Sequence, residues 1–136
     1  MSVEFADTNT VIYSLSEDAI KRRKALAILA RKPILSIQVL NETANTMCRK
    51  LGFDIPAIRQ FLIDLMRESS MHPITPATVL AALAVAERYG SSHYDSLVVA
   101  TALGAGCDTL YSEDIQHGQI IDNRLTVINP FRSRVG

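Results

Sequence analysis

Four acidic side chains lie at places along the sequence where a folded chain can bring them together. Asp7 and Asp114 each come shortly after an apolar run that is typical of a buried strand. Glu42 lies in the second turn of a predicted long helix, and Asp95 lies in the first turn of a strongly apolar helix. Because ligands in open α/β sheets bind beyond the carboxyl ends of the strands, these carboxylates are expected to converge at one end of a sheet.

Carboxylates that lie close together repel one another, and this repulsion raises their pKa values. A hard divalent cation removes the penalty, and Mg²⁺ typically combines a few carboxylates with water and substrate phosphates. A site of this kind can polarise a phosphodiester, activate a water molecule and stabilise the leaving oxygen, with either one metal ion or two. Spacing and composition alone therefore predict an α/β domain with a candidate metal site.

Each acid also has a purely structural interpretation. Asp7 can form an Asx turn or cap the helix that follows it, and Asp95 can favour a helix N-terminus through the helix dipole. Asp114 can be a surface loop residue, and Glu42 points away from the apolar stripe predicted for its helix, as a solvated side chain does. For Asp95 the balance shifts toward function, because a charge entering so apolar a helix is costly without a partner.

The elements that must position these acids alternate along the chain. Strands are predicted at residues 3–6, 33–35, 71–75, 109–111 and 125–128, and helices at 11–15, 18–31, 36–50, from 54, from 75 to 90 and at 93–105. Asp18, Ser36 and Asp54 are predicted N-caps. This order predicts an α/β fold in which helices sandwich a mostly parallel central sheet of four to five short strands. No repeat or linker divides residues 1–136, so a single domain is expected.

The composition is that of a globular protein, with 48% hydrophobic residues and a formal net charge of zero. The absence of a basic excess argues mildly against strong non-specific binding of nucleic acid. The N-terminus lacks a signal-peptide pattern and no apolar run could span a bilayer, so a cytoplasmic protein without membrane contact is expected. Cys48 and Cys107 fit no zinc pattern and are predicted to be buried, reduced thiols. Cys48 belongs to the apolar stripe predicted for the helix at 36–50, which consists of Ile37, Leu40, Ala44, Met47, Cys48 and Leu51.

Several segments, in order along nearly the whole chain, resemble the PIN-domain nucleases and their VapC-like toxins. They are residues 5–9 with the motif Asp7-Thr8-Asn9, residues 36–42, residues 94–100, residues 111–114 with their continuation to 119, and residues 129–131. The chain differs from the common family pattern at Thr10 and Ser96, where apolar residues are usual. Neither difference removes an acid.

The resemblance implies an endoribonuclease that hydrolyses RNA phosphodiester bonds with Mg²⁺ or Mn²⁺. It implies that the metal is carried by Asp7, Glu42, Asp95 and Asp114, of which Asp7 and Asp95 are the most direct ligands. Supporting hydroxyl or amide groups would come from Thr8, Asn9 and Ser112. VapC-like members are toxins of type II toxin–antitoxin pairs, usually homodimers, and a cognate antitoxin inhibits them by placing its tail in the acidic site. RNA would approach along basic clusters such as residues 21–24 and 49–50.

Other functions fit parts of the same pattern. A PIN module without catalytic activity could bind RNA or serve in assembly, and a housekeeping nuclease could process RNA with the same four acids. The presence of all four acids favours an enzyme over the binding module. A metal-dependent phosphatase would also place an aspartate after the first strand, but the sequence Asp7-Thr8-Asn9 lacks the Asp-x-Asp pattern that such an enzyme would show.

Overall fold

A six-stranded sheet forms the centre of the fold in a computed structural model, which describes residues 2–132. Its strands are β1 (Glu4–Ala6), β2 (Ile34–Ser36), β3 (Ser70–His72), β4 (Thr109–Tyr111), β5 (Ile120–Ile121) and β6 (Leu125–Ile128). They are arranged in the order β3-β2-β1-β4-β6-β5. All neighbouring pairs are parallel except β5 and β6, so a mostly parallel sheet is confirmed.

The order of the strands reverses between β1 and β4, which pair in parallel with Phe5 opposite Leu110. The chain builds outward from β1 in one direction to β3, and then returns to place β4 on the other side of β1. A reversal of this kind leaves a crevice beyond the carboxyl ends of the two strands, where α/β proteins bind ligands. Asp7 directly follows β1 and Ser112 directly follows β4, so both lie at this crevice.

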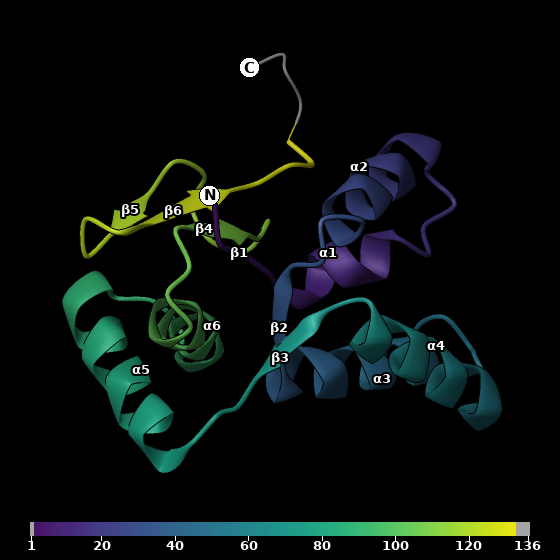
Figure 1. The fold of residues 1–136 in the computed structure, drawn as a ribbon, viewed down its shortest axis with the longest axis horizontal. Helices are drawn as coiled ribbons and strands as arrows, with labels where there is room; N and C mark the ends of the chain where they lie inside the picture. Colours follow the sequence, from purple (N-terminus) through teal and green to yellow (C-terminus); the bar gives the residue numbers. More distant parts are fainter. Residues whose placement is uncertain (1, 133–136) are drawn as a thin grey trace.

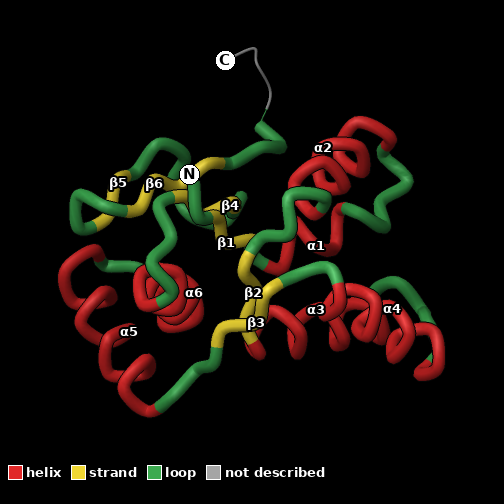
Figure 2. Tube along the Cα trace, viewed as in Figure 1, coloured by secondary structure: helices red, strands yellow, loops and turns green. Residues whose placement is uncertain are grey.

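Six helices cover the sheet on its two faces (Figure 1). They are α1 (Thr8–Tyr13), α2 (Ala19–Leu29), α3 (Ile37–Arg49), α4 (Ile55–Arg67), α5 (Pro76–Tyr89) and α6 (His93–Gly104). Helices α1 to α4 lie on one side, and α5 and α6 lie together on the other (Figures 1 and 2). None of the helices in residues 2–132 combines the length and apolar character that crossing a bilayer requires.

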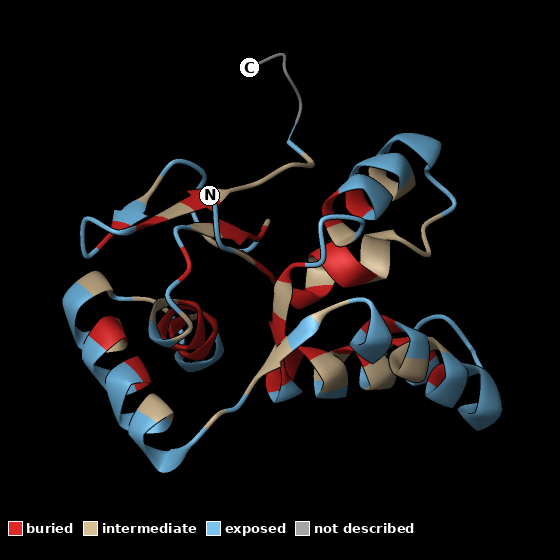
Figure 3. Cartoon of the chain, in the orientation of Figure 1, coloured by how far each residue is buried: buried red, intermediate tan, exposed pale blue. Residues whose placement is uncertain are grey.

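Helix α6 is the most deeply buried helix, as its apolar sequence predicts. Every residue from Ser96 to Ala102 is buried, whereas α5 leaves its outer face exposed (Figure 3). The predicted N-caps are also confirmed, since the side chains of Asp18, Ser36 and Asp54 each accept hydrogen bonds from backbone N–H groups of the helix that follows. Asp7 caps α1 in the same way, so this helix begins at Thr8, before the start predicted at residue 11.

The structure corrects three further expectations. The sheet has a sixth strand, β5, whose two residues are too few to produce a sequence pattern. The third strand spans 70–72 instead of 71–75, because Pro73 has no N–H to donate to a strand ladder. Cys48 is exposed while Cys107 is buried. Cys48 was misplaced because the buried face of α3 runs through Val39, Thr43 and Met47, and of the predicted stripe only Met47 is fully buried.

Candidate active site

Asp7 lies at the centre of the candidate site, between the end of β1 and the start of α1. Its side chain is only 4% exposed. The Thr8 backbone N–H donates a hydrogen bond of 2.7 Å to Asp7 Oδ1, and the Ser112 hydroxyl donates one of 2.7 Å to Oδ2. Both carboxylate oxygens are therefore oriented, one by the helix and the other by the loop after β4.

Burial raises the pKa of Asp7 to about 6. The hydrogen bonds from Ser112 and Thr8 act in the opposite direction, because they stabilise the charged form. The negative charges of Asp114 and Glu42 raise the pKa further. The electrostatics thus place three of the four predicted acids in one neighbourhood.

Glu42 reaches the site from the second turn of α3, where it is half-buried. Thr8 Oγ1 donates to Glu42 Oε2 at 3.2 Å, and Gln38 Nε2 donates to Glu42 Oε1 at 2.8 Å. The solvated interpretation of Glu42 is therefore wrong. Its position follows from the face that α3 buries, which includes the polar side chains of Gln38 and Thr43.

Asp114 lies in the exposed loop after β4. Asn9 Nδ2 donates to Asp114 Oδ2 at 3.0 Å, and the Asp114 backbone N–H donates to Ser112 Oγ at 3.2 Å. Asn9 Oδ1 also accepts from the Glu113 backbone N–H at 3.3 Å. The loop is thus fastened to α1 by the two groups, Asn9 and Ser112, that were predicted to support the acids.

Asp95 occupies the first turn of α6, and its backbone N–H donates to the capping hydroxyl of Ser92. Partial burial raises the pKa of Asp95, and the charge of Asp114 raises it further. Asp95 therefore belongs to the same electrostatic group as the other acids, although no hydrogen bond within residues 2–132 joins its carboxylate to them.

The donor set fits a hard divalent cation in chemistry. All candidate ligands are carboxylate oxygens, and the two ion pairs found within residues 2–132, Arg31–Glu4 and Arg88–Asp122, involve none of the four acids. Their mutual repulsion is thus left without a compensating cationic side chain. In the described part of the chain no three His, Cys, Asp or Glu side chains are already spaced for ligation. The carboxylate side chains would therefore have to move closer together to bind a metal ion.

The family described as the PIN domain matches residues 5–121, which include all four acids. The chain belongs to the PIN-domain family. No curated protein matches it in sequence.

Solved structures show the same fold at low identity. A toxin–antitoxin complex from Klebsiella pneumoniae matches with a TM-score of 0.71 at 19% identity, covering 97% of this chain and 100% of the other. Mycobacterium tuberculosis VapC20, described as a sarcin–ricin-loop-cleaving toxin, matches with a TM-score of 0.65 at 22% identity, covering 80% and 88%. Rickettsia felis VapBC2, bound to a promoter DNA fragment, has a TM-score of 0.67 at 17% identity, covering 92% and 96%.

The two departures from the common PIN pattern are buried hydroxyls with partners. Thr10 is fully buried, and its Oγ1 donates to the carbonyl of Tyr111 at 3.4 Å. Ser96 is also fully buried, and its hydroxyl lies 2.7 Å from that of Ser91. Because each of these hydroxyls has a hydrogen-bond partner, burying it beneath the site does not carry the free-energy penalty of an unpaired polar group.

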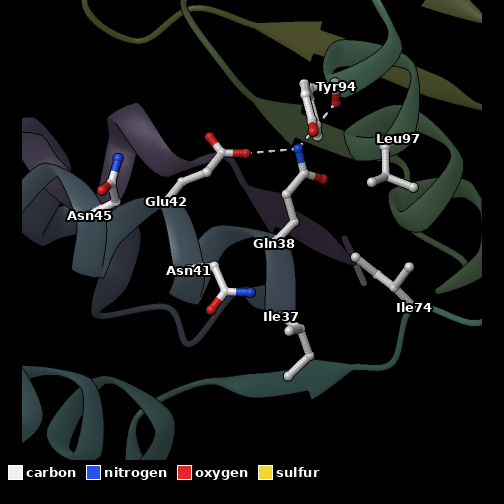
Figure 4. A pocket seen from close by; sticks show the side chains of 8 residues that line it. All are labelled: Ile37, Gln38, Asn41, Glu42, Asn45, Ile74, Tyr94 and Leu97. Atoms are coloured by element: carbon white, nitrogen blue, oxygen red, sulfur yellow. Dashed lines mark hydrogen bonds between the residues drawn. The ribbon is translucent and has the colours of Figure 1, made fainter.

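Two hollows of the PIN domain meet at Glu42. One, of about 320 Å³, lies between α1, α3 and the loop after β4, and Lys50 and Asp114 are among its lining residues. The other, of about 670 Å³, lies mainly between α3 and α6, and we call it the α3–α6 hollow (Figure 4). Gln38 bridges this second hollow, since its Nε2 donates both to Glu42 and, at 3.2 Å, to the carbonyl of Tyr94.

Gln38 is the site residue that the sequence analysis missed. It lies four residues before Glu42, the spacing at which side chains on one helix face meet, and that spacing was the available signal. The buried face of this helix was predicted from apolar residues such as Ile37 and Leu40. Gln38 was therefore excluded, because a glutamine is not expected on a buried face.

Proposed function

We propose that this protein is a metal-dependent endoribonuclease that hydrolyses RNA phosphodiester bonds. The observation that carries the proposal is the meeting of Asp7, Glu42 and Asp114, with Asp95 nearby, at the switch point of the sheet and without a cationic partner. Such a group of carboxylates is costly to hold together for structural reasons alone. Membership of the PIN-domain family supports a nuclease.

The four acids would hold Mg²⁺ or Mn²⁺, with Asp7 and Asp95 as the most direct ligands. When bound, the metal supplies charge stabilisation at the phosphate and a water that is easier to deprotonate. The chain's own groups hold the carboxylates: Ser112 and the Thr8 backbone N–H orient Asp7, Thr8 Oγ1 orients Glu42, and Asn9 orients Asp114.

The RNA would cross the site from the smaller hollow. Lys50 lines that hollow together with Asp114, so an ammonium group is available there for a phosphate next to the one that is cleaved. Residues 21–24 form a second basic cluster, in which Lys21 Nζ lies 4.7 Å from the centre of the Tyr13 ring. The formal net charge is zero, so these local clusters supply the attraction for RNA.

We further propose that residues 1–136 act as one nuclease domain and as the toxin of a type II toxin–antitoxin pair in the cytoplasm. The similar structures from Klebsiella pneumoniae and Rickettsia felis support this role, because the first is a toxin–antitoxin complex and the second is a VapBC protein bound to promoter DNA. The protein would form a homodimer, and its cognate antitoxin would cover the acids.

The alternative is a PIN module that binds RNA or serves in assembly without cleaving it. The raised pKa of Asp7 favours the enzyme, because keeping a buried carboxyl next to two others costs stability that a binding module has no reason to retain. A housekeeping processing nuclease would use the same chemistry, and only the presence of an antitoxin separates it from a toxin.

Cleavage of a structured RNA by purified Asp7→Asn and Asp95→Asn tests the enzyme. Each variant should lose activity by roughly three orders of magnitude, because the metal supplies several kcal/mol of stabilisation. Asp64→Asn, which changes an exposed aspartate on α4, is the matched control and should retain activity. EDTA should abolish wild-type cleavage, and added Mn²⁺ or Mg²⁺ should restore it. Full activity in folded Asp95→Asn, or in EDTA, would contradict the proposal.

A further inference from the structure

We propose that the α3–α6 hollow is a subsite that binds one unpaired base of the RNA substrate beside the scissile phosphate. This inference rests on the proposed ribonuclease function, because it assigns the hollow to the same substrate. Its volume of about 670 Å³ lies in the range of small-ligand sites. Glu42 lines both this hollow and the smaller one that contains Asp114, so the two form neighbouring compartments along one path.

The lining of the hollow suits a base and not a phosphate. Glu42 is its only charged lining residue, and no Lys or Arg of the described chain lines it. A phosphate would therefore meet a negative charge with no cation to offset it. Ile37, Ile74 and Leu97 provide apolar walls, against which the faces of a nucleobase can pack (Figure 4).

Two amide side chains are placed to contact the edge of such a base. Asn41 and Asn45 lie one turn apart on α3, both are exposed, and neither is hydrogen-bonded to another residue that lines the hollow (Figure 4). Asparagine and glutamine amides carry both a donor and an acceptor, which match the edges of bases. Tyr94 is 68% exposed and lines the hollow from α6, so its ring is available for stacking.

A third amide provides independent support for a ligand. Gln38 is only 8% exposed, and its Oε1 is buried without a hydrogen-bond partner among the residues that the structure describes. Its Nε2 is already used by Glu42 and by the Tyr94 carbonyl, which fixes the orientation of the amide. In Figure 4 the oxygen lies on the side of Leu97, away from Glu42. A buried acceptor without a partner is costly. Because Oε1 has almost no accessible surface in this conformation, a donor on a base edge would supply a partner after a small rotation of the Gln38 side chain.

The cleavage pattern of an RNA library with all four bases at each position tests the subsite. Wild-type protein should prefer certain bases at one position flanking the cut. Asn41→Ala and Asn45→Ala should each reduce that preference by about tenfold, which is the value of one good amide–base contact. Both changes place alanine in a helix, where it is favourable, so folding should not suffer. Gln60→Ala, which removes an exposed amide on α4, should leave the preference unchanged.

Direct binding of nucleosides separates failure of the subsite from failure of the enzyme. Adenosine, cytidine, guanosine and uridine, which lack a phosphate, are titrated into wild-type protein in EDTA while the side-chain amide signals of Asn41 and Asn45 are followed by NMR. At least one nucleoside should shift these signals, because each base edge carries a donor, either an exocyclic amino group or a ring N–H, that can reach Gln38. Such binding without any RNA cleavage would support the subsite and refute the enzyme.

An unchanged base preference in both asparagine variants, together with no nucleoside shifts, would overturn the subsite while leaving the nuclease intact. The same variants losing affinity for a co-expressed antitoxin, with cleavage preference unchanged, would overturn it in favour of a peptide-binding groove.

Discussion

Asp7 is the residue at which stability and chemistry oppose each other most directly. Its carboxyl is 4% exposed and has a pKa of about 6, against an ordinary value of 3.8. At a pH between these two pKa values, the Asp7 carboxyl is protonated in the folded state and ionised in the unfolded state. The free energy of unfolding therefore falls as the pH rises from about 4 to about 6, and it stays lower above that range.

At pH 8 and without metal, Asp7→Asn should have a higher free energy of unfolding than the wild-type protein. The gain should be up to about 3 kcal/mol, which corresponds to the roughly two-unit change in the pKa of Asp7. Asparagine can still accept from the Thr8 N–H as an N-cap. The gain should disappear below about pH 4, where Asp7 itself is protonated in both states. Urea denaturation in EDTA at several pH values measures this, with Asp64→Asn as the control. A gain independent of pH would mean that the charge of Asp7 is not the cause.

At the residue scale, the four acids and the supporting groups of Thr8, Asn9 and Ser112 were predicted, but Gln38 was not. Asp7 and Asp114 were found because they follow apolar strands, and a sequence shows strands well. Gln38 was missed because its contacts, with Glu42 on its own helix and with the Tyr94 carbonyl of α6, depend on how α3 and α6 approach one another. Hydrogen bonds between distant elements leave no periodic signal in the sequence.

At the scale of elements, the helices were predicted better than the faces they bury. Helix α6 is apolar on all sides, so any packing buries it, and this prediction is confirmed. Helix α3 is amphipathic, and its buried face contains Thr43 and Gln38 while Ile37 is 50% exposed. Tertiary packing overrode hydrophobicity there, since the buried face of α3 also carries Gln38, which donates to Glu42.

Gly90 and Gly104 give a matched test of backbone conformation at the C-terminal ends of α5 and α6. Gly90 ends α5 with a φ of 72° and Gly104 lies in the last turn of α6, and an added Cβ would meet nothing within 4 Å at Gly90 and only His72 Nε2, at 3.8 Å, at Gly104. Gly90→Ala should therefore reduce the free energy of unfolding by about 1–2 kcal/mol through backbone strain alone. Gly104→Ala should raise it by up to about 1 kcal/mol. Urea denaturation measures both, and equal signs would contradict the interpretation.

For the whole molecule, the important electrostatic quantity is local charge and not net charge. The chain carries equal numbers of acidic and basic residues, yet at the end of the sheet the charge of Asp114 raises the pKa of both Asp7 and Asp95, and the charge of Glu42 raises that of Asp7. The composition therefore gave no indication of a site whose concentrated negative charge would repel an anionic ligand. Only the folded arrangement concentrates the negative charge.

Binding of Mn²⁺ should stabilise the whole fold, because the ion neutralises carboxylates that exist as a group only in the native state. At a free concentration 100 times Kd the gain is about 2.7 kcal/mol, or roughly 10 °C in Tm for a chain of this length. Asp7→Asn should lose most of this response. Thermal melts with and without Mn²⁺ measure it, with K⁺ at matched ionic strength as the control. An equal shift in the variant would place the ion elsewhere.

The pairing of β1 with β4 joins residues 4–6 to residues 109–111. During synthesis the first strand thus has no neighbour on that side until residues 109–111 have been made, and Asp114 follows later still. The proposed ribonuclease activity therefore cannot arise on a nascent chain that lacks residues 109–114, because the group of acids is still incomplete.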